Sequence, residues 1–178
     1  MTIKIDENIR LELIEEKHTQ AIFEVVDKNR NHLKVWLPFA EKMRTIEFTQ
    51  NFVSGTMQRN KERNEFAFVI IENNFIIGRI GVYKIDNQNK IGEIGYWIAE
   101  NAQGKGVITK SCKALMDYCF TNLLLNRIEI KCGTENYKSM AIPSRLNFKK
   151  EGIIRQGELL YEKSIDLHLY SFLKSDVK

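Results

Sequence analysis

Two glycines with a lysine between them, Gly104-Lys105-Gly106, stand where an apolar segment gives way to a long amphipathic one. Residues 91–99 are typical of a strand, and residues 104–122 carry apolar side chains at helical spacing. A turn that opens a helix presents unpaired backbone N–H groups at the positive end of the helix dipole. Because glycine lets a bulky anion approach the main chain, the sequence predicts a phosphate-binding turn.

Other kinds of glycine turn fit this segment less well. A P-loop requires Gly-x4-Gly-Lys followed by Ser or Thr, whereas the lysine here lies between the glycines. A dinucleotide fingerprint requires a third glycine, and Thr109 occupies that position. A turn without any ligand would be unfavourable, because each glycine lowers helix stability by about 1 kcal/mol. The last two alternatives stay open but disfavoured.

The surrounding segments predict an α+β fold with a mixed sheet. Three consecutive strands form an antiparallel meander, and the next strand lies parallel to residues 91–99 because a helix connects the two. The predicted strands are 9–13, 66–71, 75–83, 91–99, 127–132, 153–155 and 167–173; the predicted helices are 17–29, 45–63, 104–122 and 136–146, with a short helix or turn at 31–39. Along 104–122 the side predicted to be buried carries Val107, Ile108, Cys112, Leu115, Met116, Cys119 and Phe120.

Composition narrows the class of protein. The 178 residues predict one domain spanning 1–178, and 43% of them are hydrophobic, enough for one core. The chain has no long apolar run and no signal-like start, so we expect a cytoplasmic protein without a membrane segment. Its three cysteines are expected to be buried and reduced, and its three histidines are scattered, so no metal site is predicted. The net charge of +4 is spread along the chain, which does not indicate direct nucleic-acid binding.

The glycine turn and its neighbours together resemble a known family. Gln103-Gly104-Lys105-Gly106 is similar to the pyrophosphate-binding motif of the GNAT acetyltransferase superfamily, Gln/Arg-x-x-Gly-x-Gly/Ala, although Ile108 departs from the Gly or Ala usual at its position. Glu93-Ile94-Gly95-Tyr96-Trp97, Asn136-Tyr137-Lys138-Ser139 and residues 146–152 resemble the RimJ/RimL branch, whose members acetylate the N-terminal amines of ribosomal proteins. The resemblance runs from the first strand to Asp166, with Asn147 in place of a frequent glycine.

The resemblance implies a GNAT-like fold: a mixed, mostly antiparallel sheet flanked by helices on both faces. It also implies acetyl-CoA as cosubstrate, a protein N-terminus (Ser or Ala) as acceptor, and a homodimer as one assembly. The residues it assigns to the cosubstrate are Trp97, Ile98, Gln103, Gly104, Lys105, Gly106, Val107, Ile108, Thr109 and Asn136.

Acetyl transfer to an amine needs a group that protonates the leaving thiolate and a base that deprotonates the amine. Ser139 lies three residues after Asn136, a predicted N-cap, in the first turn of a helix whose dipole favours a thiolate; it matches the serine that is the general acid of RimL-like enzymes. Glu158, nineteen residues further on, resembles the RimL base, and Glu93 is a rival candidate.

Backbone N–H groups of the Tyr96-Trp97-Ile98 strand are expected to meet the oxyanion. Trp36, Phe39 and Tyr161 are candidates for the amine pocket, although aromatic residues in apolar segments more often belong to the core. Two other functions stay open at this point. The acceptor could be a small amine such as an antibiotic or a polyamine, or the chain could bind acetyl-CoA without catalysis.

Overall fold

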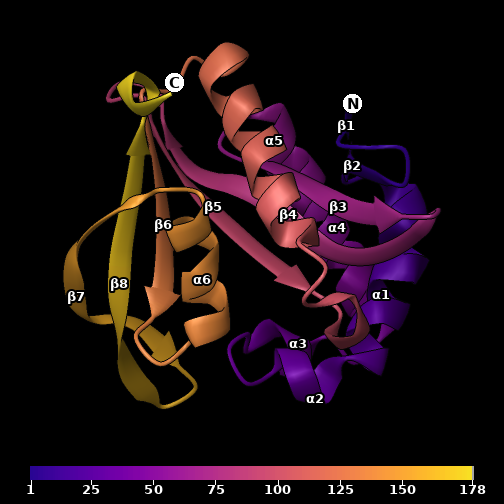
Figure 1. Cartoon of the computed structure of the whole chain (residues 1–178). Helices are drawn as coiled ribbons and strands as arrows, with labels where there is room; N and C mark the ends of the chain where they lie inside the picture. The colour runs from indigo at the N-terminus through magenta and orange to yellow at the C-terminus, as the bar shows by residue number, and fades with distance from the viewer. Residues whose placement is uncertain (178) are drawn as a thin grey trace.

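The computed structural model describes residues 1–177 and is built around one sheet of eight strands, in the order β1-β2-β3-β4-β5-β6-β8-β7 (Figure 1). Neighbouring strands are antiparallel except β5 and β6, which are parallel, as the sequence predicted. The strands are β1 (Thr2–Lys4), β2 (Ile9–Leu13), β3 (Phe66–Glu72), β4 (Phe75–Asp86), β5 (Ile91–Ile98), β6 (Arg127–Gly133), β7 (Lys149–Leu160) and β8 (Lys163–Leu173).

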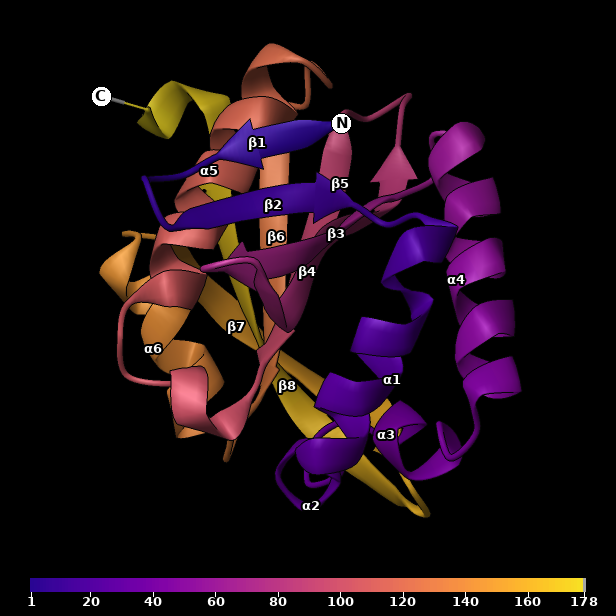
Figure 2. The same cartoon turned by 90° about the vertical axis from the view of Figure 1, so that its right-hand side faces the viewer.

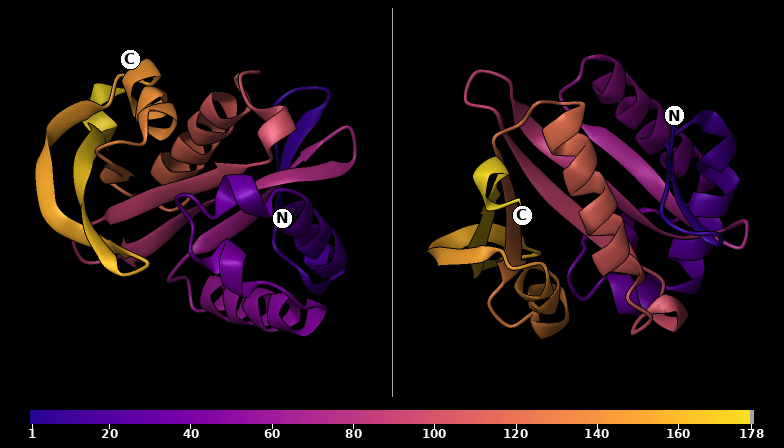
Figure 3. Two further views of the ribbon diagram at one scale, coloured as in Figure 1. Left: turned by 90° about the horizontal axis from the view of Figure 1, so that it is seen from below. Right: turned by 45° about the horizontal axis from the view of Figure 1, so that its top comes forward.

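Helices cover both faces of this sheet, which confirms the predicted fold class. Seen from below, the helices α1 (Thr19–Lys28), α2 (Arg30–Leu33), α3 (Phe39–Lys42) and α4 (Ile46–Lys61) lie on one side of the strands (Figures 2 and 3). The helices α5 (Val107–Thr121) and α6 (Tyr137–Arg145) lie on the other. β7 and β8 curve away from the rest of the sheet at one end (Figure 3). The helices within residues 1–177 fall short of the length or apolarity that crossing a bilayer requires.

The core lies on both faces of the central strands, beneath α5 on one side and beneath α1–α4 on the other. All seven apolar residues predicted for the inner side of α5 are buried, and Leu115 and Cys112 are fully so. The first six residues of β3 are all buried, which explains their continuous apolar run. Cys112, Cys119 and Cys132 are buried free thiols, as expected. The spacing of apolar residues was therefore sufficient to predict which side of α5 packs on the sheet.

A split between β5 and β6 is the feature of the sheet that matters most for the site. The two strands pair only at Ile91–Arg127, Gly92–Ile128 and Glu93–Glu129. Beyond that point β5 stays bonded to β4 as far as Ile98, and β6 stays bonded to β8 as far as Gly133. Each strand keeps its outer neighbour while losing the inner one, so the sheet opens into a wedge beside the N-termini of α5 and α6.

Several predicted boundaries were wrong. β1 was not predicted, because it has only three residues. The segment predicted as 153–155 is a strand of twelve residues, β7; it is an exposed edge strand and therefore lacks the apolar alternation that marks half-buried strands. α5 begins at Val107 rather than at position 104, because Gly106 adopts a left-handed conformation and serves as the N-cap. The short helix or turn predicted at 31–39 is the helix α2, which already ends at Leu33. Pro38 does not end a helix but is the N-cap of the next one, α3.

Candidate active site

The glycine turn has the geometry of an anion cradle. Gly104 and Gly106 have φ angles of +77° and +74°, which side chains with a Cβ rarely adopt. A Cβ built on either glycine would meet no atom within 4 Å, so the space above the turn is open. The first backbone N–H groups of α5 have no partner within their own helix. The turn therefore offers free donors, a favourable dipole and room for a bulky anion.

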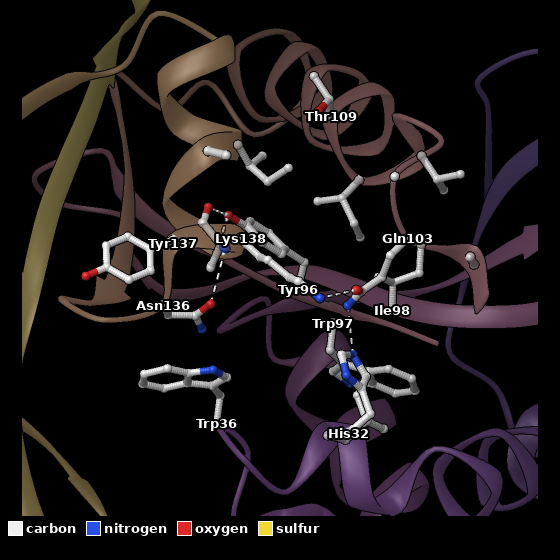
Figure 4. Close-up of a pocket in the computed structure, with 18 of the residues that line it drawn as sticks. His32, Trp36, Tyr96, Trp97, Ile98, Gln103, Thr109, Asn136, Tyr137 and Lys138 are labelled. Atoms are coloured by element: carbon white, nitrogen blue, oxygen red, sulfur yellow. Dashed lines mark hydrogen bonds between the residues drawn. The ribbon is translucent and has the colours of Figure 1, made fainter. Parts of the chain in front are cut away.

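This turn forms one wall of a cavity of about 1310 Å³. Tyr96 and Trp97 both line it, although consecutive strand residues point to opposite faces of a sheet. The cavity therefore passes through the split between β5 and β6. Figure 4 shows Asn136 and Lys138 at the start of α6, Trp36 and His32 on the opposite wall, and Thr109 in α5.

Most residues assigned to the cosubstrate come together in this cavity. Nine of the ten line it: Trp97, Ile98, Gln103, Gly104, Gly106, Val107, Ile108, Thr109 and Asn136. Lys105 does not, and its side chain is exposed on the outside of the turn. Three basic residues that the sequence analysis did not single out, Lys110, Lys138 and Arg145, also line the cavity and suit a polyanionic ligand.

Gln103 joins three parts of the cavity wall. Its side-chain nitrogen lies 2.8 Å from His32 Nε2, and its side-chain oxygen accepts a hydrogen bond of 2.9 Å from Lys138 Nζ (Figure 4). These bonds connect α2, the glycine turn and α6. His32 could not be predicted as a site residue, because nothing local relates it to Gln103, 71 positions away.

Ser139 stands at the start of α6, where the helix faces the split. The Asn136 side chain accepts the backbone N–H of Ser139 at 3.2 Å, which confirms the predicted N-cap. Ser139 Oγ donates to Tyr96 Oη at 3.4 Å and lies 3.3 Å from Cys132 Sγ. Tyr96 Oη in turn donates to the Ser139 carbonyl at 3.0 Å. Burial raises the pKa of Tyr96 and of Cys132, so both stay protonated and act as neutral partners of the hydroxyl.

The side chain of Tyr96 is a site group that was not predicted, although strand alternation indicates which face of the sheet it occupies. Tyr96 is two residues from Ile94 and Ile98 and so shares their face of the sheet, the face covered by α5 and α6. Ser139 follows on that same face at the start of α6. A polar group in an otherwise apolar alternation, opposite a predicted helix N-terminus, was the available signal.

Glu93 and Glu158 do not line the cavity and lie close enough together to influence each other electrostatically. Glu93 Oε2 accepts hydrogen bonds from Lys131 Nζ at 2.9 Å and from Lys84 Nζ at 3.1 Å. Burial alone would raise the pKa of Glu93, but these two ammonium groups outweigh it and hold that pKa below its ordinary value. Glu93 is therefore a firmly ionised and doubly paired carboxylate.

Glu158 has the opposite electrostatic character. Protein atoms partly desolvate its carboxyl group although the residue as a whole is exposed, and this desolvation raises its pKa. The negative charge of Glu93 raises the pKa further, against a smaller opposing effect of Lys84. Within residues 1–177, Glu158 takes part in no salt bridge shorter than 4.0 Å. Of the two carboxylates it is the one free to take up a proton.

Of the three candidate aromatic residues, only Trp36 lines the cavity. Its ring packs against the end of β6, where a Cβ on Gly133 would lie 2.8 Å from a Trp36 ring atom. Phe39 packs instead on Phe52 and Trp97, with ring centroids 6.3 and 6.2 Å apart. The hydroxyl of Tyr161, at the tip of the β7–β8 hairpin, donates to the Lys34 carbonyl at 2.6 Å.

Known proteins share this sequence and architecture. Residues 8–149 match the model of the acetyltransferase (GNAT) domain family. The chain is 33% identical to YdaF of Bacillus subtilis (strain 168) over 176 residues, covering 98% of this chain and 96% of that protein. It is 31% identical to the ribosomal-protein-serine acetyltransferase of Escherichia coli (strain K12), covering 96% and 95%.

A solved structure agrees with these relatives. RimL, a ribosomal L7/L12 alpha-N-protein acetyltransferase solved in complex with coenzyme A, has a TM-score of 0.94 at 27% identity and covers 99% of each chain. The chain belongs to the GNAT acetyltransferase family, in its RimJ/RimL-like branch, and is an N-acetyltransferase. The family indicated by the glycine turn and its neighbours is thereby confirmed.

Proposed function

We propose that this protein transfers the acetyl group of acetyl-CoA to the N-terminal α-amine of a ribosomal protein that begins with Ser or Ala. The observation that carries the proposal is the cavity through the β5–β6 split, with an anion-binding turn on one side and Ser139 at its centre. The relatives that act on ribosomal-protein N-termini supply the acceptor class. Such an acceptor puts the activity in the cytoplasm.

The cosubstrate is assigned to the side of the split that α5 and α6 cover. The turn at Gly104 and Gly106 would receive the pyrophosphate, because both glycines leave open space and α5 offers free N–H groups. Lys110, Lys138 and Arg145 would compensate the remaining phosphate charge. The thioester would then lie in the split, with its carbonyl against backbone N–H groups of β5 that have no β6 partner.

Ser139 is assigned the role of general acid. Its hydroxyl lies in the first turn of α6, where the helix dipole stabilises a departing thiolate. The contacts with Tyr96 and Cys132 hold Oγ in place without supplying a charge that would oppose the thiolate. The amine attacks the thioester carbonyl directly, the C–S bond breaks, and Ser139 protonates the sulfur. The second proton, which the nitrogen loses as it becomes an amide, restores the serine hydroxyl.

Glu158 is assigned the role of base in preference to Glu93. A protein α-amine has a pKa near 8 and is largely protonated at neutral pH, so it must lose a proton before it attacks. A carboxylate with a raised pKa accepts that proton more readily than one held ionised by two lysines. Glu93 then has a supporting part: its charge keeps the pKa of Glu158 high.

The test is acetyl-CoA turnover against a panel of acceptors, followed by free-thiol release and by mass spectrometry of the product. We expect acetylation of peptides that start with Ser or Ala and none of the same peptides with a blocked N-terminus. Turnover of spermidine or of lysine side chains alone would replace the proposed acceptor by a small or side-chain amine. Tight acetyl-CoA binding without any product would contradict catalysis altogether.

A further inference from the structure

The strand that carries Glu158 is interrupted just before this residue. Along β7 and β8, Ile154 lies opposite Leu167 and Glu158 lies opposite Ile165. Three residues of β7 between these pairs therefore face a single residue of β8, Asp166. The result is a bulge with two extra residues, a device that commonly re-aims a side chain near an active site.

The bulge decides where Glu158 lies along the hairpin. If the register of the Ile154–Leu167 pair continued unbroken, Gln156 would lie opposite Ile165 and Glu158 opposite Lys163, at the hairpin end. The two extra residues move Glu158 by two strand positions, about 6.6 Å, towards the centre of the sheet. An even shift keeps the side chain on the same face, so only its position along the strand changes.

This bulge has an unfavourable backbone that needs support. Gln156 has a φ of +50°, in the left-handed region that residues other than Gly, Asn and Asp seldom adopt. Asp166 Oδ1 accepts the backbone N–H of Gln156 at 2.8 Å, a charge-assisted bond. Next to it, a Cβ on Gly157 would lie 2.9 Å from Ile154 Cγ2 and 3.1 Å from Leu167 Cδ1, so a larger residue would require these side chains to shift.

Asp166 also contacts the segment that leads to Ser139. Its backbone carbonyl accepts the N–H of Thr134 at 3.1 Å. Thr134 follows the last residue of β6 and stands two residues before Asn136, the N-cap of α6. Asp166 thus has two contacts. Its side chain holds the bulge before Glu158, and its main-chain carbonyl holds the loop before the helix of Ser139.

We propose that Asp166 is a positioning residue for acetyl transfer: by holding the Gln156 bulge, its carboxylate fixes Glu158 in reach of the acceptor amine. This inference rests on the proposed function, because it gives Glu158 the role of base. Strain of this kind persists only where the surrounding structure enforces it. Loss of the Asp166 acceptor should let the bulge relax and Glu158 move outward, away from Glu93.

The test compares Asp166→Ala, Asp166→Asn and Asp86→Ala. The asparagine variant keeps an oxygen that can accept the Gln156 N–H. Asp86 is the matched control: it is likewise half-buried and accepts backbone N–H groups at 2.9 and 2.8 Å, but in the turn after β4. Each variant is measured for kcat, for the Kd of coenzyme A and for hydrogen exchange of the Gln156 amide. The Glu158 carboxyl is followed by carbon NMR titration.

For Asp166→Ala we expect kcat to fall about 10- to 100-fold, since a displacement near 1 Å can have that effect, with the Kd of coenzyme A unchanged. The Gln156 amide should lose protection, and the pKa of Glu158 should move down towards its ordinary value as the carboxyl leaves Glu93. Asp166→Asn should restore most of kcat, and Asp86→Ala should change none of these quantities.

The measurements separate the inference from the function on which it rests. Unchanged Gln156 exchange and an unchanged Glu158 titration in Asp166→Ala would overturn the positioning role, whatever the activity. A shifted titration with unchanged kcat would uphold the contact but refute Glu158 as the base. Equal losses in Asp166→Ala and Asp86→Ala would show a general effect on folding and would also overturn the inference.

Discussion

Replacing Gly106 by valine should weaken coenzyme A binding while the protein stays folded, with only a modest loss of stability. In the protein without ligand a Cβ at this position meets no atom within 4 Å, so the first atom of the new side chain enters open space. The cost is conformational, because φ is +74°. A left-handed backbone costs an L-residue about 1–2 kcal/mol, which corresponds to a melting temperature lower by roughly 2–8 °C for a chain of this size.

The effect on binding comes from the space that the valine side chain would fill. If a phosphate sits above the turn, the new side chain holds it away from the N–H groups of α5. Loss of one charge-assisted hydrogen bond costs about 1.5–3 kcal/mol, which is about a 10- to 100-fold increase in Kd. The expected loss of affinity is therefore larger than the loss of stability can explain.

Isothermal calorimetry with coenzyme A and thermal unfolding of the free protein measure the two effects separately. Asn74→Val is the matched control, since Asn74 also has a positive φ of +68° but lies in the β3–β4 turn outside the cavity. It should lower the melting temperature by a similar amount and leave the Kd unchanged. A Kd within about twofold of the wild type in Gly106→Val, well below one tenfold step of 1.4 kcal/mol, would refute the phosphate cradle.

Three further predictions concern single side chains. Ser139→Ala should lower kcat by about 10²- to 10⁴-fold, the usual contribution of a general acid, while coenzyme A still binds. The control Ser144→Ala, on the same helix, should behave as wild type. Equal activity in both variants would exclude Ser139 as the acid. Because the pKa of Glu158 is raised, wild-type kcat/KM should fall as the pH drops through a value above 4.5. Glu158→Gln should be slow at every pH and should lack this acidic fall in rate. If the variant still shows the fall, another group is the base. The pKa of Glu12 is lowered to about 2, chiefly by its hydrogen bond to Arg10, so Glu12 should contribute stability above pH 4.5 that is lost as the pH falls towards 2. Denaturant titrations should show that the free energy of unfolding depends less on pH in this window for Glu12→Gln than for the wild type. An equal slope in both proteins would contradict this contribution.

Local patterns were enough to predict most elements near the site. The apolar spacing of α5, the N-cap at Asn136 and the glycine turn before α5 are properties of a few neighbouring residues, so the sequence shows them directly. β7 escaped prediction because an exposed edge strand has no apolar face to reveal it. The start of α5 was placed three residues early, because composition alone does not show that both glycines adopt a positive φ.

The roles of the two carboxylates could not be separated in the sequence. Both are single glutamates in strands, and either could be the base. In the folded chain Lys131, 38 residues away, bonds to Glu93. Glu158 has no salt-bridge partner among residues 1–177, and desolvation raises the pKa of its carboxyl group. The charges around a site come from residues that only tertiary structure brings within a few ångströms. Here they shift the pKa values of two identical side chains in opposite directions, down for Glu93 and up for Glu158.

The sequence by itself determined that this chain forms a glycine turn at the N-terminus of a helix, and it predicted anion binding there, because the backbone freedom of glycine and the helix dipole are local properties. Tertiary structure alone decided what that turn serves. The wedge between β5 and β6 exists because each strand remains bonded to its outer neighbour, and the place of Glu158 depends on a bulge held by Asp166. Pairing between whole strands sets both features, and no pattern of a few neighbouring residues encodes it.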